Sequence, residues 1–224
     1  MQKVIIAIDG PAAAGKSTIA KKVANQLGFV YVDTGAMYRA FTYYILKHNI
    51  DPQDEEKSCA VIDDVDIRLL PDGTVLCNDE DVTKVIRTSE VSRNVSYIAS
   101  YKKIRLALVE SQRKMAHNTS VVMDGRDIGT YVLPNADIKI FQVASVKVRA
   151  ERRYKENLEK GITCTLAELE ADIERRDYID SHRDFAPLTQ APDAILLDTS
   201  DMTIDEVVDE ILNIIAKKVG NIHA

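Results

Sequence analysis

The residues best suited to chemistry stand near the start of the chain, in the run Gly10-Pro11-Ala12-Ala13-Ala14-Gly15-Lys16-Ser17. The run matches the pattern G-x-x-x-x-G-K-[ST] in full. Its glycines allow a tight loop whose backbone N–H groups face a phosphate, and a helix that begins near Lys16 adds its positive end. Lys16 would bridge the β- and γ-phosphates of ATP, and Ser17 would place its hydroxyl on Mg²⁺. The segment through Thr18 is therefore predicted to bind ATP.

An ordinary glycine-rich turn from strand to helix is the alternative interpretation of this run. Residue frequencies give the full pattern by chance in roughly one chain in a hundred of this size. An apolar strand-like run before it and a helix-like pattern after it make chance less likely still. We therefore expect a nucleoside triphosphate at this loop.

Two aspartates are candidates for holding the metal. Asp124 ends the apolar run Ser120 to Met123 and has the character of a Walker B carboxylate. Asp33 follows another short apolar run and competes for the same role. The sequence does not separate the two.

Arginines follow the predicted strands and share predicted helix faces. Arg126 comes directly after a buried run, between two aspartates, and Arg149 and Arg153 are four residues apart on one face. Arg grips phosphate with two parallel N–H bonds. We predict that Arg126, Arg149 and Arg153 act with Lys16 as the catalytic cations. For the last two arginines, a solvated helix face with ion pairs is an equally good interpretation.

Composition excludes several classes of protein. The 224 residues carry 29 Lys and Arg against 35 Asp and Glu, a net charge of −6, which disfavours a nucleic-acid partner. The apolar run from Val4 to Ile8 is far shorter than the ~20 residues that cross a bilayer, and its flanks do not resemble a signal peptide. We expect no membrane partner and a cytoplasmic location. Three scattered cysteines predict neither a disulfide framework nor a zinc site.

Apolar runs and helical periodicities alternate along the chain. The runs typical of buried parallel strands are Val4–Ile8, Phe29–Val32, Ser120–Met123, Ile138–Val143 and Ala194–Leu197. The predicted helices cover 16–27, 36–48, 89–99, 101–118, 151–160, 166–179 and a last segment to 217, the last two opened by the capping boxes Thr165–Glu168 and Thr203–Glu206. This alternation predicts an α/β fold of the P-loop class, a three-layer sandwich with a central parallel sheet, as one domain over 1–224.

Two further features interrupt that alternation. Residues 66–70 and 74–78 flank the turn Pro71-Asp72-Gly73 and predict a β-hairpin, the candidate for a small inserted antiparallel subdomain. The two charged helices at 151–160 and 166–179, joined at 160–164, predict a helical lid that closes over the site and keeps water out.

The glycine-rich run at 10–17, a P-loop, does not by itself determine which reaction is catalysed. The chain has no Asn-Lys-x-Asp run, so it lacks the motif with which guanine-nucleotide switch proteins recognise the base. Phosphoryl transfer to a second nucleotide suits dispersed arginines. A kinase for another small acceptor, such as AMP or shikimate, and a module that hydrolyses ATP without an acceptor stay open at this point.

Four motifs together resemble the bacterial cytidylate kinases, in the nucleoside monophosphate kinase group: the P-loop, Asp33-Thr-Gly-Ala-Met-Tyr-Arg39, Asp124-Gly-Arg-Asp-Ile-Gly129 and Arg176-Asp-Tyr-Ile-Asp-Ser-His-Arg183. The similarity runs in order from residue 3 to about 216. It implies transfer of the γ-phosphoryl of ATP to CMP or dCMP with Mg²⁺. It also implies a core, an NMP-binding region at about 34–105 with the insert near 66–78, and a lid at about 149–183. We expect a monomer.

The resemblance also assigns residues to the CMP site. It implies that the CMP phosphate is bound by Thr34, Arg39, Arg126 and Arg183, the sugar by Arg176 and Asp180, and cytosine by Ser96, Arg105 and Asp127. The base assignment is chemically sensible, because a carboxylate accepts from the cytosine amino group and would face the uracil carbonyl repulsively. Loss of such a buried hydrogen bond can change discrimination by ~10⁴-fold.

Overall fold

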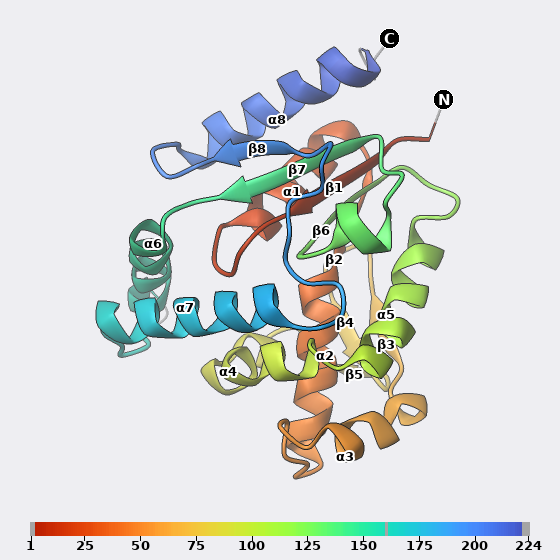
Figure 1. The fold of residues 1–224 in the computed structure, drawn as a ribbon, viewed down its shortest axis with the longest axis vertical. Coiled ribbons are helices and arrows are strands. Elements are labelled where there is room, and N and C mark those ends of the chain that lie inside the picture. The colour runs from red at the N-terminus through yellow and green to blue at the C-terminus, as the bar shows by residue number, and fades with distance from the viewer. Residues whose placement is uncertain (1–2, 160, 221–224) are drawn as a thin grey trace.

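A five-stranded parallel sheet forms the centre of the computed structural model, which describes residues 3–159 and 161–220 (Figure 1). The strand order is β2-β6-β1-β7-β8, and every neighbouring pair is parallel. The bounds are β1 Ile5–Asp9, β2 Val30–Asp33, β6 Val121–Gly125, β7 Ile138–Val143 and β8 Ile195–Asp198. The predicted α/β fold with a central parallel sheet is confirmed.

Four of the five strands extend one or two residues beyond the apolar runs that predicted them. β1, β2 and β8 each end on an aspartate, and β6 ends on Asp124 and Gly125. Backbone pairing continues after the apolar pattern stops, so Asp9 lies opposite Gly125, and Asp33 opposite Asp124. The carboxylates therefore belong to the strand ends themselves, at the edge of the sheet where parallel α/β folds bind ligands.

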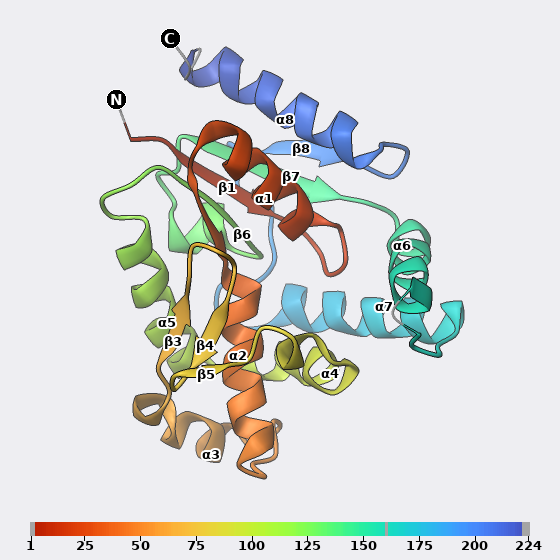
Figure 2. The same cartoon turned by 180° about the vertical axis from the view of Figure 1, so that it is seen from behind.

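Helices cover both faces of this sheet. On one face, α1 (Lys16–Leu27) and α8 (Ile204–Val219) pack their apolar stripes against β1, β6 and β7. On the other face lie α5 (Lys102–Met115) and a π-helical turn, Ile128–Val132. Figures 1 and 2 show α8 at one end of the molecule and α3 (Glu55–Ala60) at the other.

A second layer of helices stands at the carboxyl ends of the strands. α2 (Thr34–Lys47), α4 (Ser89–Ile98) and α5 share an apolar cluster below the sheet. α6 (Val146–Glu159) and α7 (Leu166–His182) lie beyond the ends of β1 and β7, as Figure 2 shows. α6 begins five residues before its predicted start, because Ser145 Oγ accepts the Val148 N–H and Arg149 and Ala150 are buried. The predicted last residue of this helix, Lys160, lies outside the described residues, whereas both predicted capping boxes are present.

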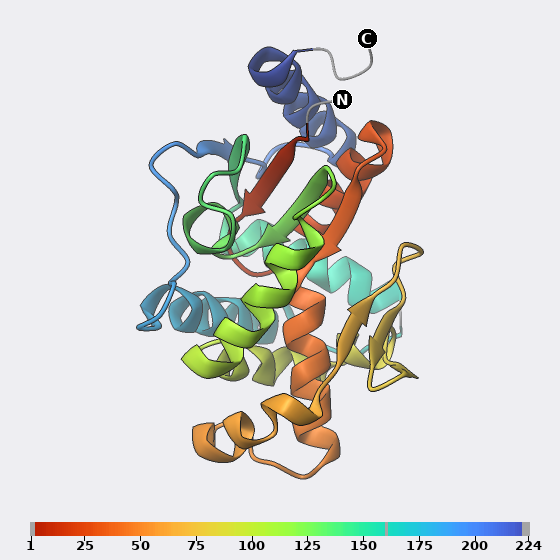
Figure 3. The ribbon, with the colours of Figure 1, turned by 90° about the vertical axis from the view of Figure 1, so that its right-hand side faces the viewer.

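The predicted hairpin at 66–78 is present and is part of a small antiparallel sheet. β3 (Ile67–Leu69) pairs with β4 (Val75–Cys77), and β4 pairs with β5 (Glu80–Asp81). Figure 3 shows this sheet, in orange to yellow, projecting beside α2. β5 has only two residues, both exposed, so no periodic pattern could reveal it.

Within the described part of the chain, no helix combines the length and the apolar character needed to cross a bilayer.

Gly10, at the start of the glycine-rich loop, has no room for a side chain. Its φ is +152°, and a Cβ there would lie 2.0 Å from the backbone oxygen of Gln142 on β7. We expect Gly10→Ala to lower the free energy of unfolding by about 3 kcal/mol or more, from backbone strain and overpacking together. Gly28→Ala is the matched control, because Gly28 has φ +67° but nothing within 4 Å. Urea denaturation would measure the free energy of unfolding of both variants. If Gly10→Ala and Gly28→Ala lower it equally, the clash with Gln142 does not destabilise the fold.

Candidate functional site

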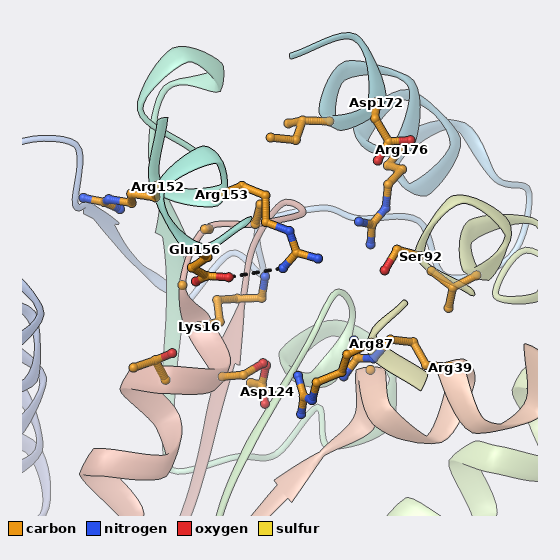
Figure 4. Close-up of a pocket in the computed structure, with 18 of the residues that line it drawn as sticks. Lys16, Arg39, Arg87, Ser92, Asp124, Arg152, Arg153, Glu156, Asp172 and Arg176 are labelled. Atoms are coloured by element: carbon orange, nitrogen blue, oxygen red, sulfur yellow. Dashed lines mark hydrogen bonds and ion pairs between the residues drawn. The ribbon is translucent and has the colours of Figure 1, made fainter. Parts of the chain in front are cut away.

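One cavity of about 1060 Å³ opens at the carboxyl ends of β2, β6 and β7. Most residues that the sequence singled out line it, although they come from eight separate elements, α1, β2, α2, α4, α5, β6, α6 and α7, and the loops between them (Figure 4). Among the predicted site residues, the cavity-lining ones are Ala13, Ala14, Gly15, Lys16, Ser17, Thr18, Asp33, Thr34, Arg39, Ser96, Arg105, Asp124, Arg126, Asp127, Arg153, Arg176, Asp180 and Arg183. The four that do not line it are Gly10, Pro11, Ala12 and Arg149.

The glycine-rich loop ends in a helix whose first N–H groups have no side-chain cap. Gly15 is the N-cap of α1 in the left-handed conformation, with φ +84°. Lys16, the first helical residue, is 4% exposed, and its Nζ donates to the Pro11 carbonyl at 2.7 Å. Burial, followed by the nearby Arg126 guanidinium, lowers the pKa of Lys16 well below its ordinary value. Uncapped amides, a helix N-terminus and a buried ammonium group form an anion site.

Ser17 and Asp124 are in direct contact at the mouth of this loop. Ser17 Oγ donates to Asp124 Oδ2 at 2.9 Å, and Tyr31 Oη donates to the other carboxylate oxygen at 2.8 Å. Burial, with a smaller contribution from the neighbouring Asp33, raises the pKa of Asp124 to about 6. A hydroxyl and a carboxylate offer the hard oxygen ligands that Mg²⁺ prefers.

Asp33 has different hydrogen-bond and ion-pair partners from Asp124. It caps α2 by accepting the Ala36 N–H at 2.7 Å, and it forms ion pairs with Arg39 and Arg87. Burial alone would raise its pKa, but these two guanidinium groups hold the pKa below its usual value. Of the two aspartates that the sequence could not separate, Asp124 is the one in contact with Ser17.

A cluster of buried charges joins the end of β6 to α7. Arg126 Nε donates to Asp180 Oδ2 at 2.9 Å. The Nε of Arg176 is buried and has no hydrogen-bond partner in residues 3–159 and 161–220. Burial and the nearby Arg126 lower the pKa of Arg176 to about 10. Figure 4 shows Arg176 pointing into the cavity and Arg153 above Lys16, where its Nη1 lies 3.4 Å from Glu156 Oε2. Arg126 and Arg176 share one hydrogen-bonded carboxylate, Asp180, so these three side chains carry a net positive charge.

The inner end of the cavity carries a buried ion pair. Arg105 Nη2 lies 2.5 Å from Asp127 Oδ2, with side-chain exposures of 1% and 5%. Arg183, which the resemblance places on the phosphate, lies here too: its Nη2 is 3.5 Å from Asp127 Oδ1, and its Nε donates to the Ala186 carbonyl. Asp9 fixes the backbone that carries Asp127 by accepting the N–H groups of the next two residues at 2.8 and 2.7 Å.

Thr34 and Ser96 complete the predicted acceptor side. Thr34 Oγ1 donates to the Asp124 carbonyl at 2.7 Å, which places its hydroxyl beside the end of β6. Ser96, on α4, is 2% exposed and lines the same cavity as the buried ion pair. Both side chains carry small hydroxyl groups, in a cavity whose lining includes charged residues as well as apolar ones such as Val95 and Ala99.

Arg149 lies behind the glycine-rich loop instead of in the cavity. Its Nε donates to the Ala144 carbonyl, and its Nη1 donates to the Ala12 carbonyl at 2.8 Å and to Asp177 Oδ2 at 2.7 Å. Asp177 Oδ1 in turn accepts the Ala12 N–H at 2.9 Å. The pair therefore holds both sides of the Ala12 residue, and ties α6 and α7 to the loop.

A family model described as cytidylate kinase matches residues 6–217. The chain belongs to the cytidylate kinase family. Cytidylate kinases from Leuconostoc mesenteroides and Ligilactobacillus salivarius are 56% and 52% identical to it, over 96% and 97% of this chain and 97% and 99% of theirs. One from Listeria monocytogenes is 53% identical over 98% of this chain and 99% of its own.

Solved structures agree with the fold of this cytidylate kinase family member. An uncharacterized protein from Eubacterium ventriosum aligns with a TM-score of 0.52 at 14% identity, covering 96% of this chain and 99% of its own. A gluconokinase from Sinorhizobium meliloti aligns with a TM-score of 0.50 at 14% identity, covering 99% and 98%. At this identity the likeness concerns the fold alone.

The cavity also contains residues that the sequence did not single out. Gln142, on β7, donates from Nε2 to the Ala14 carbonyl at 2.6 Å and so supports the loop. Its place as a polar residue inside an apolar run was the signal that could have found it. Arg87, Ser92 and Arg93 follow the inserted sheet and have no comparable signal.

Proposed function

We propose that this protein transfers the γ-phosphoryl group of ATP to CMP or dCMP, giving ADP and CDP or dCDP. The observation that carries the proposal is a cavity lined by the glycine-rich loop as well as by the buried Arg105–Asp127 pair. Family membership supports it. The same cavity is lined by the cations that two polyanions need in order to approach each other.

The bond change needs little covalent help from the protein. An oxygen of the acceptor phosphate attacks the γ-phosphorus, and the bond to the β–γ bridging oxygen breaks, so that ADP leaves with that electron pair. A monophosphate with a second pKa of about 6 is already an anion near neutral pH, so no general base is required. Lys16 and Arg126 would stabilise the charge on the transferring group, with Arg153 reaching in from α6.

Ser17 and Asp124 are the residues that would hold Mg²⁺. Among residues 3–159 and 161–220, no group of three or more His, Cys, Asp or Glu side chains is arranged for a metal. That suits Mg²⁺, which is commonly bound through one or two protein oxygens together with phosphates and water. When bound, the ion would neutralise charge on the ATP phosphates.

The remaining assignments follow the same geometry. Arg39, Thr34, Arg126 and Arg176 would surround the acceptor phosphate and sugar, together with Asp180, and Ser96, Arg105, Asp127 and Arg183 would surround the base. Residues 34–105 would form the NMP-binding region, and residues 149–183 the lid that excludes water during transfer. We also propose a monomer acting on free nucleotides, and the net charge of −6 disfavours a nucleic-acid partner.

Release of ADP, followed in a coupled assay with CMP, dCMP, UMP, AMP or no acceptor, tests the proposal. We expect the greatest kcat/KM with CMP or dCMP and little turnover without an acceptor. Highest kcat/KM with AMP would assign the cavity to a different acceptor. Hydrolysis of ATP that CMP does not change would indicate a nucleotide-dependent module without an acceptor.

The contacts of Arg149 and Asp177 predict that they position the loop for ATP. In Asp177→Ala, the Ala12 N–H and the Arg149 guanidinium both lose a partner. We expect the KM for ATP to rise about tenfold, the equivalent of ~1.4 kcal/mol, while the KM for CMP changes less than threefold. Glu174→Ala is the control, an exposed residue on the same helix. Equal changes in both KM values would indicate a general disturbance of α7 instead.

A further inference from the structure

Arg87 lies on the acceptor side of the cavity and ends the short 3-10 turn Val85–Arg87, which follows the small inserted sheet. Its Nη2 lies 3.3 Å from Asp33 Oδ2, and Arg39 Nη2 lies 3.1 Å from the same oxygen. Figure 4 shows the two arginine side chains next to each other on the floor of the cavity, near Asp124. Two guanidinium groups therefore share one carboxylate.

This sharing leaves positive charge uncompensated. Asp33 carries one negative charge and also accepts the Ala36 N–H, so it cannot saturate both guanidinium groups. The Nε of Arg39 is buried and finds no partner among the residues that the structure describes. The side chain of Arg87 is 53% exposed and lines the cavity. Unused N–H donors on adjacent arginines suit a phosphate dianion.

The inserted sheet holds Arg87 in this place. Val82 and Ile86, which precede it, are fully buried in a cluster with Ala36 and Ala40 of α2. Glu80 of β5 adds polar contacts to α2 by accepting from Tyr43 Oη at 2.9 Å and Lys47 Nζ at 2.6 Å. Because Arg39 is also on α2, the sheet and the helix form one packed unit that carries both arginines.

We propose that Arg87 binds the phosphate of the acceptor nucleotide together with Arg39, and that the small sheet serves to hold it there. The inference rests on the proposed function, since it takes a nucleoside monophosphate as the acceptor. It adds Arg87 to the residues proposed to bind the acceptor, and it assigns to the inserted subdomain the role of positioning that side chain. If Arg87 only neutralised Asp33, its loss would affect ligands with and without a phosphate alike.

The test compares CMP with cytidine, which has the same base and sugar but no phosphate. Titration calorimetry would measure both dissociation constants for the parent, Arg87→Met and Arg87→Lys. We expect Arg87→Met to weaken CMP binding about tenfold or more and cytidine binding less than twofold. Arg87→Lys should recover part of the CMP affinity, because it restores the charge without the paired N–H donors. Arg68→Met is the matched control, an exposed arginine of the same sheet paired with Asp66 and Asp79.

The outcomes separate this inference from the proposed function. Equal losses for CMP and cytidine in Arg87→Met, or no loss for either, would overturn the role of Arg87 while CMP remained the acceptor. A parent protein that binds neither ligand would overturn the proposed function, and this inference with it. Since Arg87 is half-exposed, the variants are expected to fold, and an unchanged thermal midpoint verifies it.

Discussion

Lys16→Ala is expected to reduce kcat by about 10³-fold or more, because a charged donor aimed at a transferring phosphoryl group contributes at that scale. Lys16 lines the cavity at the start of α1, and its ammonium group is buried between the loop and the strand-end carboxylates. Its contact with the Pro11 carbonyl shows that the side chain already reaches across the loop. When ATP is bound, the ammonium group of Lys16 would donate to phosphate oxygens in place of that carbonyl.

The fold should survive this substitution. Asp124 keeps its hydrogen bonds from Ser17 and Tyr31, and Asp9 keeps its two backbone N–H donors. We therefore expect circular dichroism of the variant to match the parent while steady-state turnover collapses. Lys21→Ala, an exposed lysine on the same helix, is the control and should keep parental turnover. Turnover of Lys16→Ala within about tenfold of the parent, only ~1.4 kcal/mol in barrier height, would contradict the role of Lys16.

Much of the fold and the geometry of the glycine-rich loop could be predicted because their signals are local. The run Gly10–Ser17 has its residues in order, and buried parallel strands such as Ile138–Val143 appear as unbroken apolar runs. Both capping boxes were visible for the same reason. The geometry of a motif that is contiguous in sequence is determined mainly by its own residues, so the sequence alone can predict it.

The rest of the site depends on contacts between distant segments. Spacing placed Arg149 and Arg153 on one helix face, yet the fold directs Arg149 to Ala12 and Asp177 and leaves only Arg153 in the cavity. Asp33 and Asp124 are opposite each other in the sheet, so only the partners of each, Arg39 for one and Ser17 for the other, distinguish them. No pattern along the chain records such pairings.

Asp127→Asn is expected to reduce the preference for CMP over UMP, by up to ~10⁴-fold if Asp127 supplies the whole discrimination. A carboxylate can only accept, so it favours the amino group of cytosine and repels the carbonyl that uracil has at the same place. Asparagine can accept through its oxygen or, after rotation, donate through its amide nitrogen. The variant should therefore gain kcat/KM with UMP as it loses kcat/KM with CMP.

The ratio of the two kcat/KM values is the right measurement, since a partly unfolded preparation lowers both equally. This matters because Asp127 is paired with the fully buried Arg105, and removing one charge of such a pair can cost about 3–5 kcal/mol of stability. Asp79→Asn, at an exposed aspartate paired with Arg68, controls for the substitution itself and should leave the ratio unchanged. If the CMP to UMP ratio of Asp127→Asn equals that of the parent, Asp127 does not read the base, and its buried pair with Arg105 serves only to hold α5 against the strand ends.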